Sequence, residues 1–325
     1  MQPHPNSYPD PQFTLYLAPI RGITDALYRN TFVRYFNGFD LAVAPFVTTQ
    51  QGNRIKPGHL RDLEPKKNRA LPIIPQILSK DPDHFITLAQ ALIDQGHRQI
   101  NWNLGCPYPM VANKKRGSGL LPYPDRITSF LDKIRKLPVD LSIKTRLGRF
   151  QADEILQLMP IFNDFPLTEL IIHPRTGKQM YTGKVDLEAF GQCLEQSRHP
   201  VIYNGDITDE GVFLQIKARF KNVDGWMIGR GALADPFLPA RIKKIPLPGD
   251  KRERIRLFHD DIFGQYQEIL FGPSHILGRM KGLWFYLSQS FANSRKILKK
   301  IQKTKTLQKY NKIVEQIFSE DEWIR

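Results

Sequence analysis

Eight short apolar runs constrain the fold of this chain more than any other feature of its sequence. Each run is rich in Val, Ile, Leu and Phe and is followed by a loop and a stretch of helical spacing, which is typical of a strand that leads into a helix. The runs recur about every thirty residues and cover 13–17, 41–46, 73–77, 99–103, 141–146, 169–173, 201–204 and 225–228. Eight such units predict a (β/α)₈ TIM barrel, and their even spacing favours it over the alternative, a doubly wound open sheet.

The same pattern divides the chain into three parts. Strand and helix patterns alternate over 13–245, which predicts an α/β barrel domain that carries the catalytic site. A linker rich in Pro and Gly follows, and the helical pattern of 250–325 predicts a small C-terminal all-α domain. Residues 1–12 are polar and rich in Pro, so we expect a flexible N-terminal tail without the features of a secretory signal.

The composition excludes several classes of protein. Cys106 and Cys193 are the only cysteines, which are too few for a disulfide framework or a cysteine metal cluster, so we expect no metal site and a cytoplasmic location. No apolar run approaches membrane-spanning length, so we expect no membrane association. We expect a monomer.

The net charge of +15 favours a polyanionic partner, with nucleic acid as the leading candidate. The alternative is a basic surface that only keeps the protein soluble. One stretch of the C-terminal region holds no acidic residue but many basic ones, at positions Arg295, Lys296, Lys299, Lys300, Lys303, Lys305, Lys309 and Lys312. Apolar residues between them keep helical spacing, so these side chains form either a solvated helix face or an RNA-binding face.

Polar and glycine-rich clusters follow the predicted strands. In a TIM barrel the active site forms at the C-terminal ends of the strands, which is where these clusters lie. They are 18–22, Phe46, Gln76, 103–107, 144–148, 173–176, 204–206 and 229–231. The sequence therefore predicts one site at one end of the barrel.

The last two strand ends have features of a phosphate site. Asn204, Gly205 and Asp206 follow the seventh run, and Gly229 and Arg230 follow the eighth. Backbone N–H groups of such turns can face one phosphate, and Arg230 adds a positive charge. Either glycine alone could be required only by a tight turn. Two such turns at consecutive strand ends favour a phosphorylated cofactor.

The middle strands end in side chains suited to a flavin ring. Lys144 and Arg146 lie on the same strand face, because side chains alternate along a strand. A cation at Lys144 could stabilise a reduced flavin, although a structural lysine paired with a carboxylate is the alternative. Gln76 and His173 offer hydrogen-bonding groups for the carbonyls and ring nitrogens of such a cofactor.

Cys106 stands between Gly105 and Pro107 at the end of the fourth run. No histidine near it in the sequence stands out as an activating base, so a protease-like nucleophile is a poor interpretation. A thiol with an ordinary pKa of about 8.5 stays mostly protonated at neutral pH, as a general acid must. The alternative is a small buried residue, which describes Cys193.

These clusters, taken in order, resemble the motifs of the bacterial tRNA-dihydrouridine synthases, flavin enzymes that reduce specific uridines of tRNA with NADPH. The resemblance covers the barrel and extends weakly into the helical region. The matching elements are 18–25, Gln76, 103–107, 117–121, 144–148, 173–176, Gln179, Tyr181, Gly183, 204–206 and 227–232. A short match at 279–281, Tyr286 and Leu287 resembles the subfamily that acts on position sixteen of the tRNA D-loop.

The resemblance implies a role for each site residue. Asn103 would contact the flipped-out uracil, and Arg175 and Tyr181 would lie close to the nucleotide. Cys106 would donate the proton to C5 of the uracil after hydride arrives at C6. The FMN ring and its phosphate would be held by Ala18, Pro19, Ile20, Gln76, Lys144, His173, Asn204, Gly205, Asp206, Gly229 and Arg230.

Some positions depart from the family pattern, and two other functions stay open. Ile20 replaces the usual Met, Asn101 an Asp, Pro174 a Gly and Leu187 a Trp. An FMN barrel that acts on a free small molecule such as dihydroorotate would share the phosphate loops but would not need the basic charge. A tRNA-binding protein with a lapsed flavin site would not need to keep Cys106 and Lys144.

Overall fold

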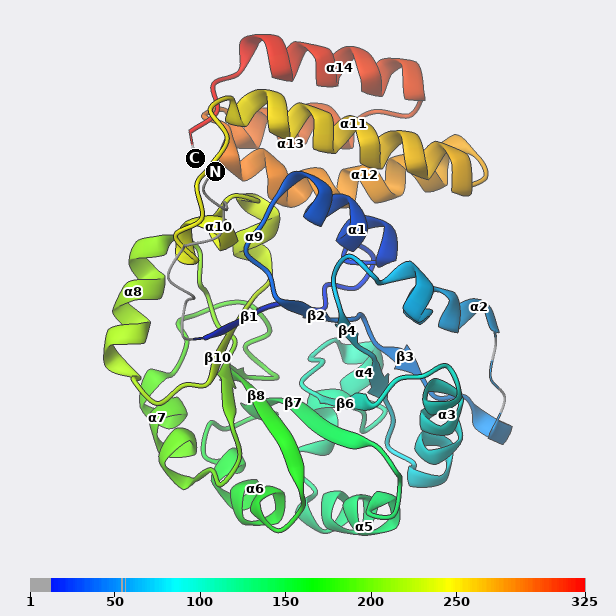
Figure 1. Ribbon diagram of the computed structural model, residues 1–325, viewed down its shortest axis with the longest axis vertical. Helices are drawn as coiled ribbons and strands as arrows, with labels where there is room; N and C mark the ends of the chain where they lie inside the picture. Colours follow the sequence, from blue (N-terminus) through cyan, green and yellow to red (C-terminus); the bar gives the residue numbers. More distant parts are fainter. Residues whose placement is uncertain (1–12, 54, 56, 325) are drawn as a thin grey trace, which may run out of the picture.

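A computed structural model describes residues 13–53, 55 and 57–324 of the chain (Figure 1). The predicted flexible tail, residues 1–12, lies outside the described residues. Among the described helices, none combines the length and the apolar character needed to cross a lipid bilayer.

The centre of the molecule is a parallel sheet that closes on itself. Its ten strands follow the order β3-β5-β6-β7-β8-β9-β10-β1-β2-β4, and every pairing between neighbours is parallel. The strands are β1 Thr14–Leu17, β2 Leu41–Val43, β3 Val47–Thr48, β4 Ile73–Ile74, β5 Gln76–Leu78, β6 Gln99–Leu104, β7 Asp140–Gly148, β8 Leu167–Thr176, β9 Val201–Tyr203 and β10 Gly225–Ile228.

The ten strands form eight barrel positions, because the strands at two positions are each interrupted once, and β3 begins one residue beyond the predicted run 41–46. Residues 44–46, which include Pro45, separate β2 from β3, and Pro75 separates β4 from β5. A proline supplies no N–H to a sheet ladder, which accounts for both interruptions. The two halves of each interrupted strand, β2 with β3 and β4 with β5, lie toward opposite ends of the strand order, so the ring is closed. The predicted TIM barrel is therefore confirmed, and the open sheet is wrong.

Helices cover the outside of the barrel and follow the strands in turn (Figure 1). Asp25, Asp81, Asp186 and Asp209 each cap a helix by accepting a hydrogen bond from a backbone N–H three residues further on. The helices are α1 Ala26–Tyr35, α2 Pro57–Leu60, α3 Pro82–Asp94, α4 Pro109–Ala112, α5 Pro124–Ile134, α6 Glu154–Asn163, α7 Leu187–Gln196, α8 Glu210–Arg219, α9 Arg230–Ala234 and α10 Leu238–Ile242.

A layer of four helices covers one side of the barrel, next to α1 and α9 (Figure 1). It consists of α11 Lys251–Ile269, α12 Pro273–Leu287, α13 Ser294–Gln302 and α14 Leu307–Glu320. Phe32 of α1 and Phe36 directly after it belong to the same apolar cluster as Phe258 and Trp284 of this layer. The rings of Phe36 and Phe258 lie 4.9 Å apart. The division into separate domains stays a prediction, since one apolar cluster crosses the boundary.

A buried hydrogen-bond network holds the helical layer together. The Trp284 indole N–H donates to the Tyr310 hydroxyl over 2.8 Å, and that hydroxyl lies 2.6 Å from Nε2 of His259. Because the hydroxyl accepts from Trp284, its own proton is free to bond His259. Burial lowers the pKa of His259, so the ring is neutral at physiological pH. The network fixes α12, whose final turn reaches the mouth of the barrel.

Candidate active site

A cavity of about 800 Å³ opens at the C-terminal ends of the barrel strands. Every residue that the sequence analysis assigned to the cofactor, to the uridine or to proton transfer lines it. This arrangement follows from the closed ring, in which all parallel strands end at the same rim. The structure thus brings the whole predicted set together, while the role of each residue stays a prediction.

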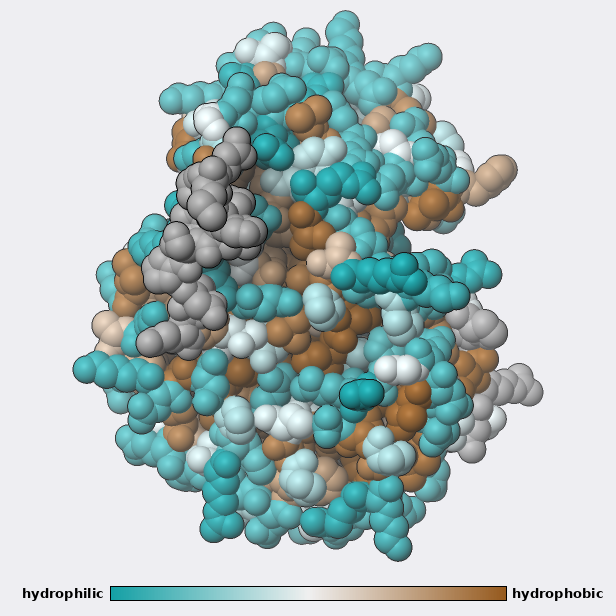
Figure 2. Space-filling view, viewed as in Figure 1, coloured by the Kyte–Doolittle hydropathy of each residue, from teal (hydrophilic) through white to brown (hydrophobic). Residues whose placement is uncertain are grey.

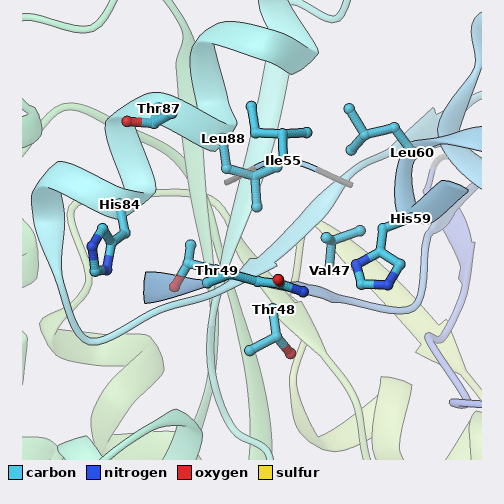
Figure 3. A pocket seen from close by; sticks show the side chains of 10 residues that line it. Val47, Thr48, Thr49, Ile55, His59, Leu60, His84, Thr87 and Leu88 are labelled. Carbon is cyan, nitrogen blue, oxygen red and sulfur yellow. The ribbon is translucent and has the colours of Figure 1, made fainter. Parts of the chain in front are cut away.

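A second hollow lies outside the barrel between β3, α2 and α3 (Figure 3). It measures about 20 Å³ and is lined by Val47, Thr49, His59, Leu88 and neighbouring side chains. That volume holds about one water molecule, so it cannot take a cofactor. No group of three or more His, Cys, Asp or Glu side chains in the described part of the chain could hold a metal ion.

A chain of buried amides positions the Cys106 backbone. Oδ1 of Asn103 accepts from the N–H groups of Cys106 and the residue before it, over 2.9 and 3.1 Å. Its Nδ2 therefore faces Gln76 and donates to Oε1 over 2.7 Å. Nε2 of Gln76 then donates to Asn101 over 2.7 Å, and Nδ2 of Asn101 donates to Ser142 over 2.8 Å. Each amide orientation in the series follows from the one before it.

The Cys106 thiol lies on the wall of the cavity and is almost fully buried. Burial raises its pKa, although Arg146 and other nearby cations oppose the rise. The backbone N–H and the hydroxyl of Ser118 both donate to the Cys106 carbonyl, over 3.1 and 3.0 Å. Gly117 must be glycine here, because a Cβ would come within 2.7 Å of that carbonyl oxygen. The thiol is thus held in place and stays protonated at neutral pH.

Two cations project from β7 into the cavity. Burial, reinforced by Arg146, lowers the pKa of Lys144 to about 7, and the Lys144 ammonium makes no hydrogen bond or ion pair with the described residues. Burial also lowers the pKa of Arg146 to about 10. The Arg146 guanidinium donates to the carbonyls of Gly105 and Thr176, over 3.0 and 2.8 Å. A half-buried lysine without a partner favours a bound group that accepts hydrogen bonds or carries negative charge.

Every N–H group of the Arg175 guanidinium forms a hydrogen bond within the protein. Its guanidinium bonds the carbonyls of Thr182 and Gly183, both carboxylate oxygens of Asp206, and Nε2 of His173. These bonds use all five N–H groups of an arginine. The predicted contact between Arg175 and the nucleotide would therefore not be a direct guanidinium hydrogen bond in this arrangement. Arg175 instead positions the loop after β8.

His173 is neutral and its tautomer is fixed. A guanidinium can only donate, so Nε2 of His173 accepts from Arg175 over 3.2 Å and Nδ1 carries the proton. Burial lowers the pKa of His173 well below its ordinary value, and the positive charges of Arg146 and Lys144 lower it further. His173 therefore presents an N–H donor to the cavity without adding charge.

Unpaired backbone donors gather at the ends of β9 and β10. The N–H groups of Gly205, Gly229, Arg230 and Gly231 make no hydrogen bond within the described residues. The Arg230 guanidinium lies beside them and bonds Asp206 over 2.6 Å. A Cβ at Gly229 would approach the Ala18 and Ile20 side chains to 3.1 and 3.2 Å. Free N–H groups beside an arginine fit an anionic group such as a phosphate.

Several lining residues were missed by the sequence analysis. Phe285, Tyr286 and Gln289 reach the cavity from α12 and the turn after it. No spacing rule links a C-terminal helix to the ends of strands, and only the short family match at Tyr286 pointed to it. Asn101 and Ser142 were also missed as members of the amide chain, because a hydrogen bond between neighbouring strands depends on register.

The wall of the cavity is strongly basic. Five cations line it, at Arg21, Lys144, Arg146, Arg175 and Arg230, against the single carboxylate of Asp206 among the described lining residues. Asp206 is shared by two of these arginines. The site is therefore suited to an anionic ligand.

Comparison with known proteins identifies the family. The family profile for dihydrouridine synthase (Dus) matches residues 16–322. This chain belongs to the dihydrouridine synthase family. The tRNA-dihydrouridine synthase B of Pasteurella multocida is 32% identical over 231 residues, which cover 69% of this chain and 67% of the relative. That of Shewanella oneidensis is 28% identical over 281 residues, or 81% of this chain and 84% of the relative.

Solved structures share the fold of this dihydrouridine synthase at low sequence identity. A variant of NCR from Zymomonas mobilis superposes with a TM-score of 0.51 and 13% identity, over 74% of this chain and 89% of the other. A morphinone reductase mutant in complex with tetrahydroNAD superposes with a TM-score of 0.52 and 10% identity, over 71% of this chain and 86% of the other. These two likenesses bear on the barrel fold alone.

The pKa of Cys106 gives a test that needs no substrate. The thiolate is the species that alkylating agents attack, and burial raises the pKa of this thiol. We expect the alkylation rate of Cys106 by iodoacetamide, followed by peptide mass spectrometry, to reach half its maximum above the ordinary thiol pKa of about 8.5. Cys193 is fully buried and should react only on unfolding. A midpoint below pH 8 for Cys106 would contradict the electrostatic description of the site.

Proposed function

We propose that this protein is an FMN-dependent tRNA-dihydrouridine synthase, which reduces the C5–C6 double bond of a D-loop uridine with NADPH as the electron donor. One observation carries the proposal. A protonated thiol, a half-buried lysine without a partner and a group of free backbone N–H donors share one cavity. Family membership and the names of the Pasteurella and Shewanella relatives support the same reaction.

The residues present fit FMN. The free N–H groups of Gly205, Gly229 and Gly231, with Arg230, would hold its phosphate. Lys144, Gln76 and His173 would face the flavin ring, and 18–20 would pack beside it. When bound, FMN would relay electrons from NADPH and supply the hydride to C6 of the uracil.

The protein's own part in the reaction is to orient the base and deliver a proton. Cys106 would donate its proton to C5 of the uracil, since burial keeps the thiol protonated at neutral pH. Asn103 retains one amide hydrogen beyond its bond to Gln76, which can bond a uracil carbonyl. Tyr181 and the loop held by Arg175 would border the nucleotide. The uridine must leave the tRNA fold to enter the cavity.

The basic face formed by α13, the turn after it and α14 is the proposed second contact with tRNA. We define it as Arg295, Lys296, Lys299, Lys300, Lys303, Lys305, Lys309 and Lys312, none of which forms an ion pair with a described residue. Ile297 and Ile301 pack into the core on the opposite side of α13. Hydrophilic side chains cover much of the helical layer (Figure 2). Unpaired lysines on a helix can neutralise RNA phosphates.

The cofactor assignment predicts that the protein purifies yellow with non-covalent FMN. Arg230→Glu should lower flavin occupancy sharply, because the new carboxylate would lie beside the phosphate donors and Asp206. Absorbance near 450 nm against total protein measures occupancy. A colourless wild-type protein that takes up no added FMN would exclude the assignment.

Removal of the thiol tests the proton donor. We expect Cys106→Ala to keep FMN and tRNA binding but to reduce uridine more slowly by about 10²–10⁴-fold, the usual effect of a positioned general acid. Cys193→Ala, which lies in α7 away from the cavity, is the matched control and should behave as wild type. Dihydrouridine formed in unmodified tRNA is the quantity to measure. Equal rates for both variants would mean that another group supplies the proton.

Four lysines of the basic face provide a test of tRNA binding. Replacement of Lys296, Lys299, Lys300 and Lys303 by Gln should weaken binding of every tRNA alike. The slope of log affinity against log salt should shrink by nearly one unit per lost phosphate contact.

The matched control changes the same charge elsewhere on the barrel. Lys66, Lys80, Lys136 and Lys221 are exposed and make no ion pair with a described residue. Their replacement by Gln should leave the salt slope close to wild type. Equal effects of the two quadruple variants would mean that only net charge matters, and that tRNA contacts other basic residues.

A further inference from the structure

Aromatic side chains with exposed faces surround the mouth of the cavity. Tyr108, Tyr181 and Phe285 line it while remaining 46%, 37% and 52% exposed. Tyr286 also lines it and is half-buried. Large aromatic side chains are usually buried, so a group of them around one opening indicates a surface for contact with a ligand or partner.

These rings come from three separate parts of the chain. Tyr108 follows β6, Tyr181 lies in the loop after β8, and Phe285 belongs to α12. The rings of Tyr108 and Tyr181 lie 6.4 Å apart, and those of Phe285 and Tyr286 lie 5.0 Å apart with their planes nearly perpendicular. Tyr286 of α12 and Tyr108 of the loop after β6 line the same cavity.

The charges around these rings favour an anionic partner with flat faces. The Arg230 and Arg146 guanidinium groups lie 4.8 and 5.3 Å from the centre of the Tyr181 ring. Nucleotides combine a phosphate with a planar base, and proteins that bind single-stranded RNA pair cations with stacking aromatics in this way. An apolar peptide or a lipid surface would place these arginines in contact with uncharged groups, at a desolvation cost.

We propose that Phe285, with Tyr108 across the mouth, stacks on the base of a nucleotide next to the target uridine. The inference rests on the proposed function and extends it from the target base to its neighbour. A uridine that flips into the cavity no longer stacks on that neighbour. The exposed face of Phe285 replaces the lost contact, so this side chain contributes to the choice of tRNA site.

Phe271 provides a matched control within the same helical layer. It is 96% exposed, lies in the turn between α11 and α12, and does not line the cavity. Replacement of either phenylalanine by Ala removes an exposed aromatic ring from this layer. Only the change at Phe285 should affect RNA.

The test measures the affinity of the FMN-loaded protein for two forms of one substrate tRNA. One form is intact, and the other lacks the bases on both sides of the target uridine. We expect Phe285→Ala to weaken binding of intact tRNA by roughly 5- to 150-fold, the range found for one stacked base. Phe285→Tyr should restore most of the affinity, because its ring can still stack. Phe271→Ala should bind as wild type.

The comparison between the two tRNAs decides the role of Phe285. On the tRNA without flanking bases, Phe285→Ala should cost little, since no base remains to stack. An equal loss of affinity on both tRNAs, or no loss on intact tRNA, overturns the proposal. Because affinity is read directly, these outcomes are separate from a failure of the proposed function, which would appear as absence of dihydrouridine with the wild-type enzyme.

Discussion

The pairing of β1 with β10 is the interaction on which the site depends. The four residues Thr14–Leu17 lie in parallel register with Gly225–Ile228, and the N–H of Ala18 continues the ladder to the carbonyl of Ile228 over 2.8 Å. This pairing closes the ring and brings the first strand end against the last. Gly229 then lies so close to Ala18 that a Cβ would approach to 3.1 Å. The proposed ring-binding and phosphate-binding segments thus become neighbours, although about two hundred residues separate them in the chain.

Closure also gathers basic side chains around one cavity. Lys144 is half-buried and has no anionic partner among the described residues, and its low pKa of about 7 reflects the partial loss of contact with water. Burial also raises the pKa of Cys106. The same physical cause therefore favours the neutral form of both groups, the protonated thiol and the uncharged amine. Asp206, held between Arg175 and Arg230, links the phosphate donors to the loop that carries Tyr181. The proposed proton donor, the proposed cofactor site and the loop proposed to border the nucleotide therefore share one electrostatic environment.

Much of the fold followed from the sequence because strand and helix spacing are local properties. The β1 and β10 runs were predicted to within a residue of their observed bounds. The strands β7 and β8 are longer than predicted, and β8 continues through Pro174. A register shift between β7 and β8 lies at this point, next to the proline that lacks an N–H. Such irregularities depend on the partner strand and leave no local signal.

The site was predictable only where side chains follow strand ends. Cys106, Lys144 and Arg230 could be placed in one cavity because parallel strands end at one rim. The hydrogen bonds that occupy every N–H group of the Arg175 guanidinium could not be predicted, because they depend on how the loop after β8 returns to the barrel. The place of Phe285 in the cavity wall could not be predicted either, because it follows from the packing of α12 against α9 and the barrel. Contacts between elements distant in sequence form the remaining part of the site.

If this protein forms dihydrouridine in tRNA, mapping of that base in cells will show it. Total tRNA from a strain with the gene deleted, and from the same strain carrying the gene again, would be compared nucleotide by nucleotide. The account predicts that dihydrouridine disappears from a D-loop position on deletion and returns with the wild-type gene. An unchanged dihydrouridine pattern on deletion, with no modification by the purified FMN-loaded protein of tRNA that lacks the base, would contradict it.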